Sequence, residues 1–309
     1  MELRWIEDFL MLASSRSFSA AARSRHITQP AFSRRIKALE QWLGADLIDR
    51  STYPVALTSA GVNFRGVAEE VAQVLYRTRD ECRLQSNAGR PLISFAALQT
   101  LAVAFFPGWI KSCQAGAGPL FTRVQPQNVH DCVQALLAGS VDFLLCYAHS
   151  TMPLLLDPEH FPSIPIGRDR LQLMSVVDTH GKPLFGLAPA RTSPTPYLAY
   201  STDTFLSKMV QFALSGAKSR PKLELIYENS MAEALKAMVL EGHGVAWLPA
   251  ITAARELEAR RLVVLRGESL SVDLEIRLFR SNNRLRPDAE RLWAQVTGSR
   301  VGESLDRRS

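Results

Sequence analysis

Residues 18–43 read FSAAARSRHITQPAFSRRIKALEQWL, and this stretch predicts two helices joined by a tight turn. Thr28 stands at the exit of the turn as an N-cap, where we expect its hydroxyl to accept a hydrogen bond from an exposed amide. Pro30 follows in the first turn of the second helix, where a missing N–H costs little. After it, apolar residues recur at helical spacing, namely Phe32, Ile36, Leu39 and Leu43.

The second helix also has a polar face. Gln29, Ser33 and Lys37 lie four residues apart on that face, and Arg34 lies about 100° round the helix from Ser33. Amide and guanidinium groups read base edges in the DNA major groove, while hydroxyls and amines bind phosphates. The polar face is therefore suited to the DNA major groove.

A solvated helix face that binds nothing is the simpler interpretation. Against it, residues 14–39 contain six basic residues and no acid. The three alanines at 20–22 allow the close helix crossing that a helix-turn-helix requires. The stretch also precedes a much longer chain of different composition. Together these features favour DNA binding.

A wider set of residues carries a family resemblance: Phe18 to Ala22, Thr28 to Ile36, Leu39-Glu40, Leu43-Gly44, Leu47-Ile48, Arg50 and Leu57-Thr58. This pattern resembles the LysR-type transcriptional regulators. The resemblance implies an N-terminal all-α winged helix-turn-helix at residues 1–58, with its motif at 18–37, and a C-terminal α/β effector domain of two periplasmic-binding-protein-like lobes. With the WLP segment at 247–249, the pattern is most similar to the hypochlorite-responsive branch of that family.

Two short alternating segments around Pro54 form a plausible hairpin, which would be the wing. The resemblance implies that the wing lies near the minor groove and that Arg50 approaches the sugar–phosphate backbone. An exposed arginine without a partner is the alternative for Arg50. The predicted DNA contacts are base reading by Gln29, Ser33 and Arg34, with phosphate binding by Thr28, Arg35, Lys37 and Arg50, beside Pro30 at the helix start.

Composition restricts the class of protein. The 309 residues are 47% hydrophobic and 21% charged, as in soluble globular proteins, and are long enough for two or three domains. The net charge of +6 permits a polyanionic partner. Because the chain has no apolar run of about 18 residues and no signal-peptide layout at its start, we expect a cytoplasmic protein without a membrane partner.

The chemistry-bearing residues do not form a recognisable catalytic or metal motif. No GxSxG, Walker A, HExxH or GxGxxG pattern is present, and the histidines have no metal-like spacing. The four cysteines lack CxxC spacing, so neither zinc nor structural disulfides are expected; they are Cys82, Cys113, Cys132 and Cys146. We therefore expect no cofactor and no enzyme.

Residues 59–89 predict a linker helix followed by a hinge at 87–91. Phe64, Val67, Val71 and Val74 keep a three-then-four spacing that suits a partner helix. The stripe could instead pack on its own domain. The resemblance favours pairing of two protomers, in a homodimer or homotetramer.

Residues 90–309 alternate between strand-like and helix-like segments, which predicts an α/β domain. We expect lobe I at about 90–162 and 268–297, and lobe II at about 163–267. A cleft between such lobes collects helix N-termini, which suit small anionic or polar ligands. The candidate helix starts are Gln99, Thr100, Ser201, Thr202, Asn229 and Ser230, and the resemblance adds Cys146, Tyr147 and Gly244.

Two alternatives to a metabolite effector remain. Each Ser or Thr at a helix start is as easily a plain N-cap. Oxidation of Met or Cys could replace a ligand as the signal, and Met231 lies just after one of the helix starts. A solute-binding protein or an enzyme is the alternative of another class, and it would lack salt-dependent binding to double-stranded DNA.

Overall fold

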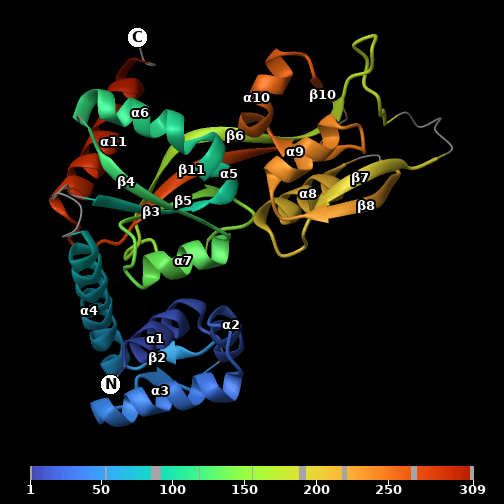
Figure 1. Cartoon of the computed structure of the whole chain (residues 1–309). Coiled ribbons are helices and arrows are strands. Elements are labelled where there is room, and N and C mark those ends of the chain that lie inside the picture. The colour runs from blue at the N-terminus through green and yellow to red at the C-terminus, as the bar shows by residue number, and fades with distance from the viewer. Residues whose placement is uncertain are drawn as a thin grey trace.

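The computed structural model of the protein describes residues 2–52, 54–84, 92–117, 119–154, 156–187, 193–217, 221–265 and 270–306. The hinge expected at 87–91 and the side chain of Cys82 lie outside the described residues. A small N-terminal domain, a long helix and a larger α/β domain follow one another (Figure 1). None of the described helices is both long enough and apolar enough to span a membrane.

The N-terminal domain is a three-helix unit with a small hairpin. Its elements are α1 (Leu3–Ser15), α2 (Phe18–Ser24), α3 (Gln29–Leu43), β1 (Ile48–Asp49) and β2 (Ala56–Leu57). Phe9, Phe32 and Ile36 are fully buried between the helices. Ile48 pairs with Leu57 in an antiparallel hairpin, which is the predicted wing.

The local sequence explains where these helices begin and end. The Ser17 hydroxyl accepts a hydrogen bond from the Ala20 N–H and caps α2. Gly44 has a φ of 71° and ends α3 in the left-handed conformation that glycine adopts at little cost. Thr28 occupies the N-cap position of α3, but its side chain makes no capping hydrogen bond, so that part of the prediction is wrong.

The C-terminal domain is built on one seven-stranded sheet, in the order β10-β6-β11-β5-β3-β4 with β9 also pairing with β6. These strands are β3 (Leu92–Leu98), β4 (Phe121–Gln127), β5 (Phe143–Ala148), β6 (Ser163–Val176), β9 (Ala246–Pro249), β10 (Leu262–Val264) and β11 (Ser271–Arg280). A second, parallel sheet joins β7 (Thr195–Tyr200) to β8 (Leu223–Asn229). The helices are α5 (Gln99–Ala104), α6 (Phe106–Ala117), α7 (Val129–Leu137), α8 (Phe205–Gly216), α9 (Ala232–Leu240), α10 (Ala250–Glu258) and α11 (Pro287–Asp306).

Strand β6 runs through both lobes. Its first part pairs with β11, which in turn pairs with β5 of the first lobe. Its last part, residues 171–176, pairs with β9 and β10 of the second lobe. The chain therefore crosses between the lobes inside a continuous strand.

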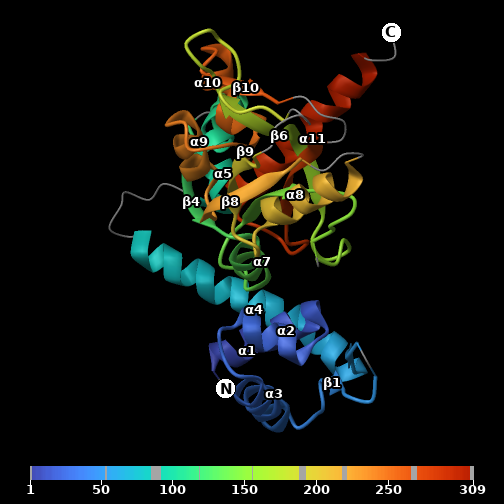
Figure 2. The same ribbon diagram turned by 90° about the vertical axis from the view of Figure 1, so that its right-hand side faces the viewer.

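Helix α4 (Ser59–Leu84) leaves the N-terminal domain, and the C-terminal domain rests on that domain through α7. In Figures 1 and 2, α7 lies beside α1 and α2. Gln134 Nε2 donates to Met11 Sδ at 2.9 Å, and His130 Nε2 lies 3.0 Å from the Ser24 carbonyl oxygen. A second contact joins Arg65 of α4 to Asp157, with Nη1 and Oδ2 3.7 Å apart. Among the described residues, polar contacts therefore join the C-terminal domain both to the N-terminal helices and to α4.

Candidate nucleic-acid interface and ligand site

The polar face of α3 points away from the other helices of the N-terminal domain. Gln29, Arg34 and Lys37 are exposed, and Ser33 is half-buried. The Ser19 hydroxyl donates to Gln29 Oε1 at 2.9 Å, which orients the amide group. Within the described ranges, neither Arg34 nor Lys37 has an acidic partner. Two cations and an oriented amide are therefore all accessible on the outward surface of α3.

Two of the basic residues counted in this region are held by acids of α1. Asp8, which is fully buried, accepts hydrogen bonds from Arg25 at 2.7 Å and from Arg35 at 3.3 Å. Arg25 also donates to Glu7 at 2.6 Å. Burial lowers the pKa of Arg25, but the Asp8 hydrogen bond and the two carboxylate charges outweigh burial and raise that pKa overall. Arg35 is thus turned into the domain, which departs from the predicted phosphate contact.

Arg50 is tethered to a buried acid that the sequence analysis missed. Glu40 Oε1 accepts hydrogen bonds from the N–H groups of Leu47 and Ile48, at 3.0 and 3.2 Å. Its other oxygen accepts from Arg50 Nη2 at 2.6 Å, and the Arg50 side chain is still 44% exposed. The available signal was an acid beside Leu39 on the buried side of α3. Glu40 fixes the wing to that helix.

Cys146 and Tyr147 do not line an accessible site. Both are fully buried in β5. The Tyr147 hydroxyl donates to Asp169 Oδ2 at 2.6 Å, and Asp169 Oδ1 accepts from the Ile251 N–H at the start of α10. An internal carboxylate therefore already occupies the N-terminus of α10. The two predictions are wrong because a mostly apolar strand is covered on both faces.

Gly244 also has a packing role. A Cβ atom at this position would lie 2.6 Å from the Pro196 carbonyl oxygen. The neighbouring residue Val245 donates its N–H to that same oxygen at 2.9 Å. Glycine is required here because β7 passes close to the backbone, and the prediction that Gly244 lines a cleft is not supported by this geometry.

The predicted helix starts are partly displaced. Helix α8 begins after Thr204, whose hydroxyl accepts from the Ser207 N–H at 3.1 Å, so Ser201 and Thr202 precede the cap. The Ser201 N–H donates to the Asn229 carbonyl oxygen at 3.2 Å, which brings the ends of β7 and β8 together.

The other predicted residues lie at or next to helix starts. Gln99 is exposed and Thr100 is buried in the first turn of α5. Ser230 is exposed, and Met231, the N-cap residue of α9, is 43% exposed. The Met231 N–H donates to Asn229 Oδ1 at 2.9 Å. The Asn229 carboxamide therefore serves the local turn.

The described cysteines are poor candidates for oxidation. Cys113, Cys132 and Cys146 are all buried. Burial raises the pKa of the Cys132 thiol to about 12, and it raises the pKa values of the other two thiols as well. A thiol is oxidised mainly as its thiolate, so these three thiols should react slowly with oxidants.

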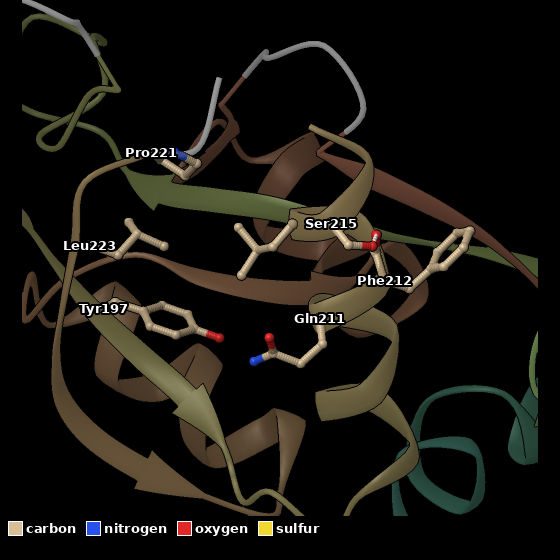
Figure 3. A pocket seen from close by; sticks show the side chains of 7 residues that line it. Tyr197, Gln211, Phe212, Ser215, Pro221 and Leu223 are labelled. Carbon is tan, nitrogen blue, oxygen red and sulfur yellow. Dashed lines mark hydrogen bonds between the residues drawn. The ribbon is translucent and has the colours of Figure 1, made fainter. Parts of the chain in front are cut away.

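A pocket of 570 Å³ lies in the second lobe, between α8 and the beginnings of β7 and β8 (Figure 3). It is lined by Tyr197, Gln211, Phe212, Leu214, Ser215, Pro221 and Leu223. It contains none of the residues predicted for effector binding. The sequence gives no signal for this pocket, because its walls come from three elements that are separate in the chain.

Comparisons with known proteins assign both domains to one family. Residues 3–62 match the family described as "Bacterial regulatory helix-turn-helix protein, lysR family", and residues 86–300 match "LysR substrate binding domain". The chain is 33% identical over 297 residues to the HTH-type transcriptional regulator YjiE of Escherichia coli (strain K12). That alignment covers 96% of this chain and 94% of the relative.

Solved structures agree over the full length. Vibrio fischeri DarR in complex with DNA is 31% identical with a TM-score of 0.61, covering 96% of this chain and 98% of that one. HypT from Salmonella typhimurium, a hypochlorite-specific LysR-type regulator, is 28% identical with a TM-score of 0.61, covering 97% and 99%. These likenesses confirm the predicted fold class. The chain therefore belongs to the LysR-type transcriptional regulators, as a DNA-binding regulator with a C-terminal effector-binding domain.

Proposed function

We propose that the protein is a cytoplasmic homo-oligomer that reads operator DNA with the α3 helices of two protomers. The observation that carries this proposal is the outward face of α3, where Arg34 and Lys37 stand without an acidic partner among the described residues. In a two-fold dimer, the half-sites lie about one helical turn apart or a multiple of it. The buried apolar side of α3 supports this geometry, because it fixes which face is presented.

We assign base reading to Gln29, Ser33 and Arg34, and phosphate binding to Thr28 and Lys37. Arg50 retains enough exposure to reach a phosphate from its tether on Glu40. Arg35 is reassigned from phosphate binding to a structural role, because Asp8 holds its guanidinium. This division separates residues that specify sequence from residues that supply affinity.

We propose that an effector acts by changing the arrangement of the two lobes, and through it the angle between paired linker helices. The paired strands β6 and β11 run between the lobes and support this view, because they are where a lobe movement would concentrate. No catalytic residue is assigned. Of the predicted effector residues, the exposed Gln99, Thr202 and Ser230 remain available to a ligand.

The DNA-binding proposal is tested by two single substitutions. Arg34→Ala should reduce discrimination at one base position by about 1–3 kcal/mol, because it removes a base-edge contact. Lys37→Ala should weaken binding to all sequences alike. The slope of log K against log salt concentration should fall by about one, because one phosphate contact is lost. Competition gel shifts with operator variants at two salt concentrations measure both. Unchanged sequence preference in Arg34→Ala would refute the base assignment.

A second candidate function is oxidant sensing, favoured by the exposed residue Met231 at the start of α9. Oxidation there would convert an apolar group into a polar one at a helix terminus. HypT, which is hypochlorite-specific, supports this candidate by its similarity. If Met231 is the oxidant sensor, Met231→Leu should abolish any oxidant-dependent change in operator binding. A change that persists in Met231→Leu would eliminate it.

A further inference from the structure

The pocket of the second lobe combines apolar walls with two polar groups at one end. Phe212, Leu214, Pro221 and Leu223 form the apolar walls. In Figure 3, the hydroxyl of Tyr197 and the carboxamide of Gln211 point toward one another. We propose that this pocket is a binding site for an uncharged, flat aromatic molecule that carries one amide, carbonyl or hydroxyl group.

The two polar groups are free to serve a ligand. In the described part of the chain, neither the Tyr197 hydroxyl nor the Gln211 carboxamide has a hydrogen-bond partner. The third polar group, the Ser215 hydroxyl, already donates to the Phe212 carbonyl oxygen at 2.8 Å. Burial raises the pKa of Tyr197, so its hydroxyl stays protonated and able to donate. A ligand amide or carbonyl would therefore satisfy two groups that the described residues leave without a partner.

The chemistry of the walls selects against ions. Among the residues that the structure describes, no charged side chain lines the pocket. Burying a charge without a partner is costly, so an anionic or cationic relative of a good ligand should bind weakly. The volume of 570 Å³ falls in the range of roughly 300–1,000 Å³ that small-molecule sites occupy, and aromatic walls are typical of such sites.

The pocket also touches the boundary between the lobes. The Phe212 ring packs on His149, which follows β5, with ring centroids 5.0 Å apart. The Tyr197 ring meets Trp247 edge-on at 5.5 Å. In Figure 3 the Phe212 ring points away from Tyr197 and Gln211, so Phe212 links the helix that lines the pocket to the end of a first-lobe strand. This consequence for regulation rests on the proposed function, whereas the binding site itself does not.

Binding is measured on the full chain without DNA, using 2-naphthamide as the probe and 2-naphthoate as its charged counterpart. Tryptophan fluorescence, to which the buried Trp247 beside Tyr197 contributes, and ligand-observed NMR report occupancy. The amide should bind saturably and at least about tenfold more tightly than the carboxylate. Tyr197→Phe should weaken the amide about fivefold by removing one hydrogen bond.

Two further variants serve as a control outside the pocket and as a variant that fills it. Tyr227→Phe is the matched control, because Tyr227 lies on β8 outside the pocket and should leave affinity unchanged. Leu223→Trp should fill the pocket and abolish binding. The proposal is refuted if the amide does not bind saturably or if the carboxylate binds more tightly than the amide. It is also refuted if Tyr197→Phe and Leu223→Trp both bind the amide as tightly as the unmodified protein does. Because DNA is absent, failure of operator binding in a separate gel shift leaves this result intact.

Discussion

Glu40 shows how much one side chain contributes to the DNA-binding domain. Its carboxylate satisfies two backbone N–H groups of the wing strand and also holds Arg50. Buried backbone donors without a partner are costly, so a single acid stabilises the hairpin that follows the recognition helix. The same acid restricts where the Arg50 guanidinium can lie.

Replacing Glu40 by glutamine should destabilise the N-terminal domain by about 2 kcal/mol, because the amide loses the charge that pairs with Arg50. Thermal unfolding followed by circular dichroism measures the change, and a domain of this size shifts by about 4–8 °C per kcal/mol. Glu70→Gln is the control, since Glu70 is exposed on α4 and its substitution should change stability by less than about 0.5 kcal/mol. Equal melting temperatures for both variants would contradict the role given to Glu40.

For single residues, the sequence predicts which side of a helix is buried, but it does not predict which side chains contact one another. Helical spacing correctly predicts that Phe32 and Ile36 are buried and that Arg34 and Lys37 are exposed. It does not show that Arg35 meets Asp8, because that acid belongs to another helix. Partners of this kind depend on how helices cross, which a single-sequence pattern does not specify.

At the scale of elements, part of the apolar stripe of α4 packs on its own domain and part of it is left open to a partner helix. Phe64 packs on Phe9 of its own domain with ring centroids 5.2 Å apart, and Val71 is partly buried against the same core. Val67 and Val74 stay 54% and 42% exposed. These two valines lie seven residues apart and form an uncovered strip that suits a partner helix.

Val67→Asp should shift the proposed oligomer toward monomers, because a charge would enter an apolar contact between helices. We expect the dissociation constant of the dimer to rise by at least about tenfold. Val62→Asp is the matched control, since Val62 is 60% exposed but lies about 140° round the helix from Val67. Sedimentation velocity at several concentrations measures both variants. Identical profiles for the two would argue against this strip as the contact.

Element types in the C-terminal domain follow well from the sequence, whereas their junctions do not. The apolar segments at 92–98 and 141–147 predict strands that the structure has as β3 and β5. The lobe boundary that the sequence places at 162–163 stays a prediction, and it lies at the start of β6, a strand with partners in both lobes. Cys146 and Tyr147 were misplaced for a related reason, since strand periodicity does not say what covers each face.

At the scale of the whole molecule, α7 of the effector domain contacts the DNA-binding domain. The double variant His130→Ala, Gln134→Ala should loosen this contact, because it removes the groups that meet Ser24 and Met11. Each lost hydrogen bond is worth about 1 kcal/mol. Hydrogen exchange measured by mass spectrometry should therefore become faster in α7 and in α1.

Lys111→Ala on α6 serves as the control, because this exposed residue lies on a helix that does not meet the N-terminal domain (Figure 1). Exchange in α1 should match the unmodified protein in that variant. If the double variant also leaves α1 unchanged, the contact through α7 contributes nothing to the stability of the domain arrangement.

The order of strands in the large sheet has a consequence for how the protein is made. Strand β11 lies between β6 and β5, so the sheet stays divided until Ser271–Arg280 has left the ribosome. Roughly 120 residues follow β5 before β11 begins, and synthesis at about 5–20 residues per second takes roughly 6–25 s over them. The N-terminal helices need none of those residues. A nascent chain therefore carries a complete DNA-reading end, with its α4 strip available to a neighbouring nascent chain, well before its sensor exists.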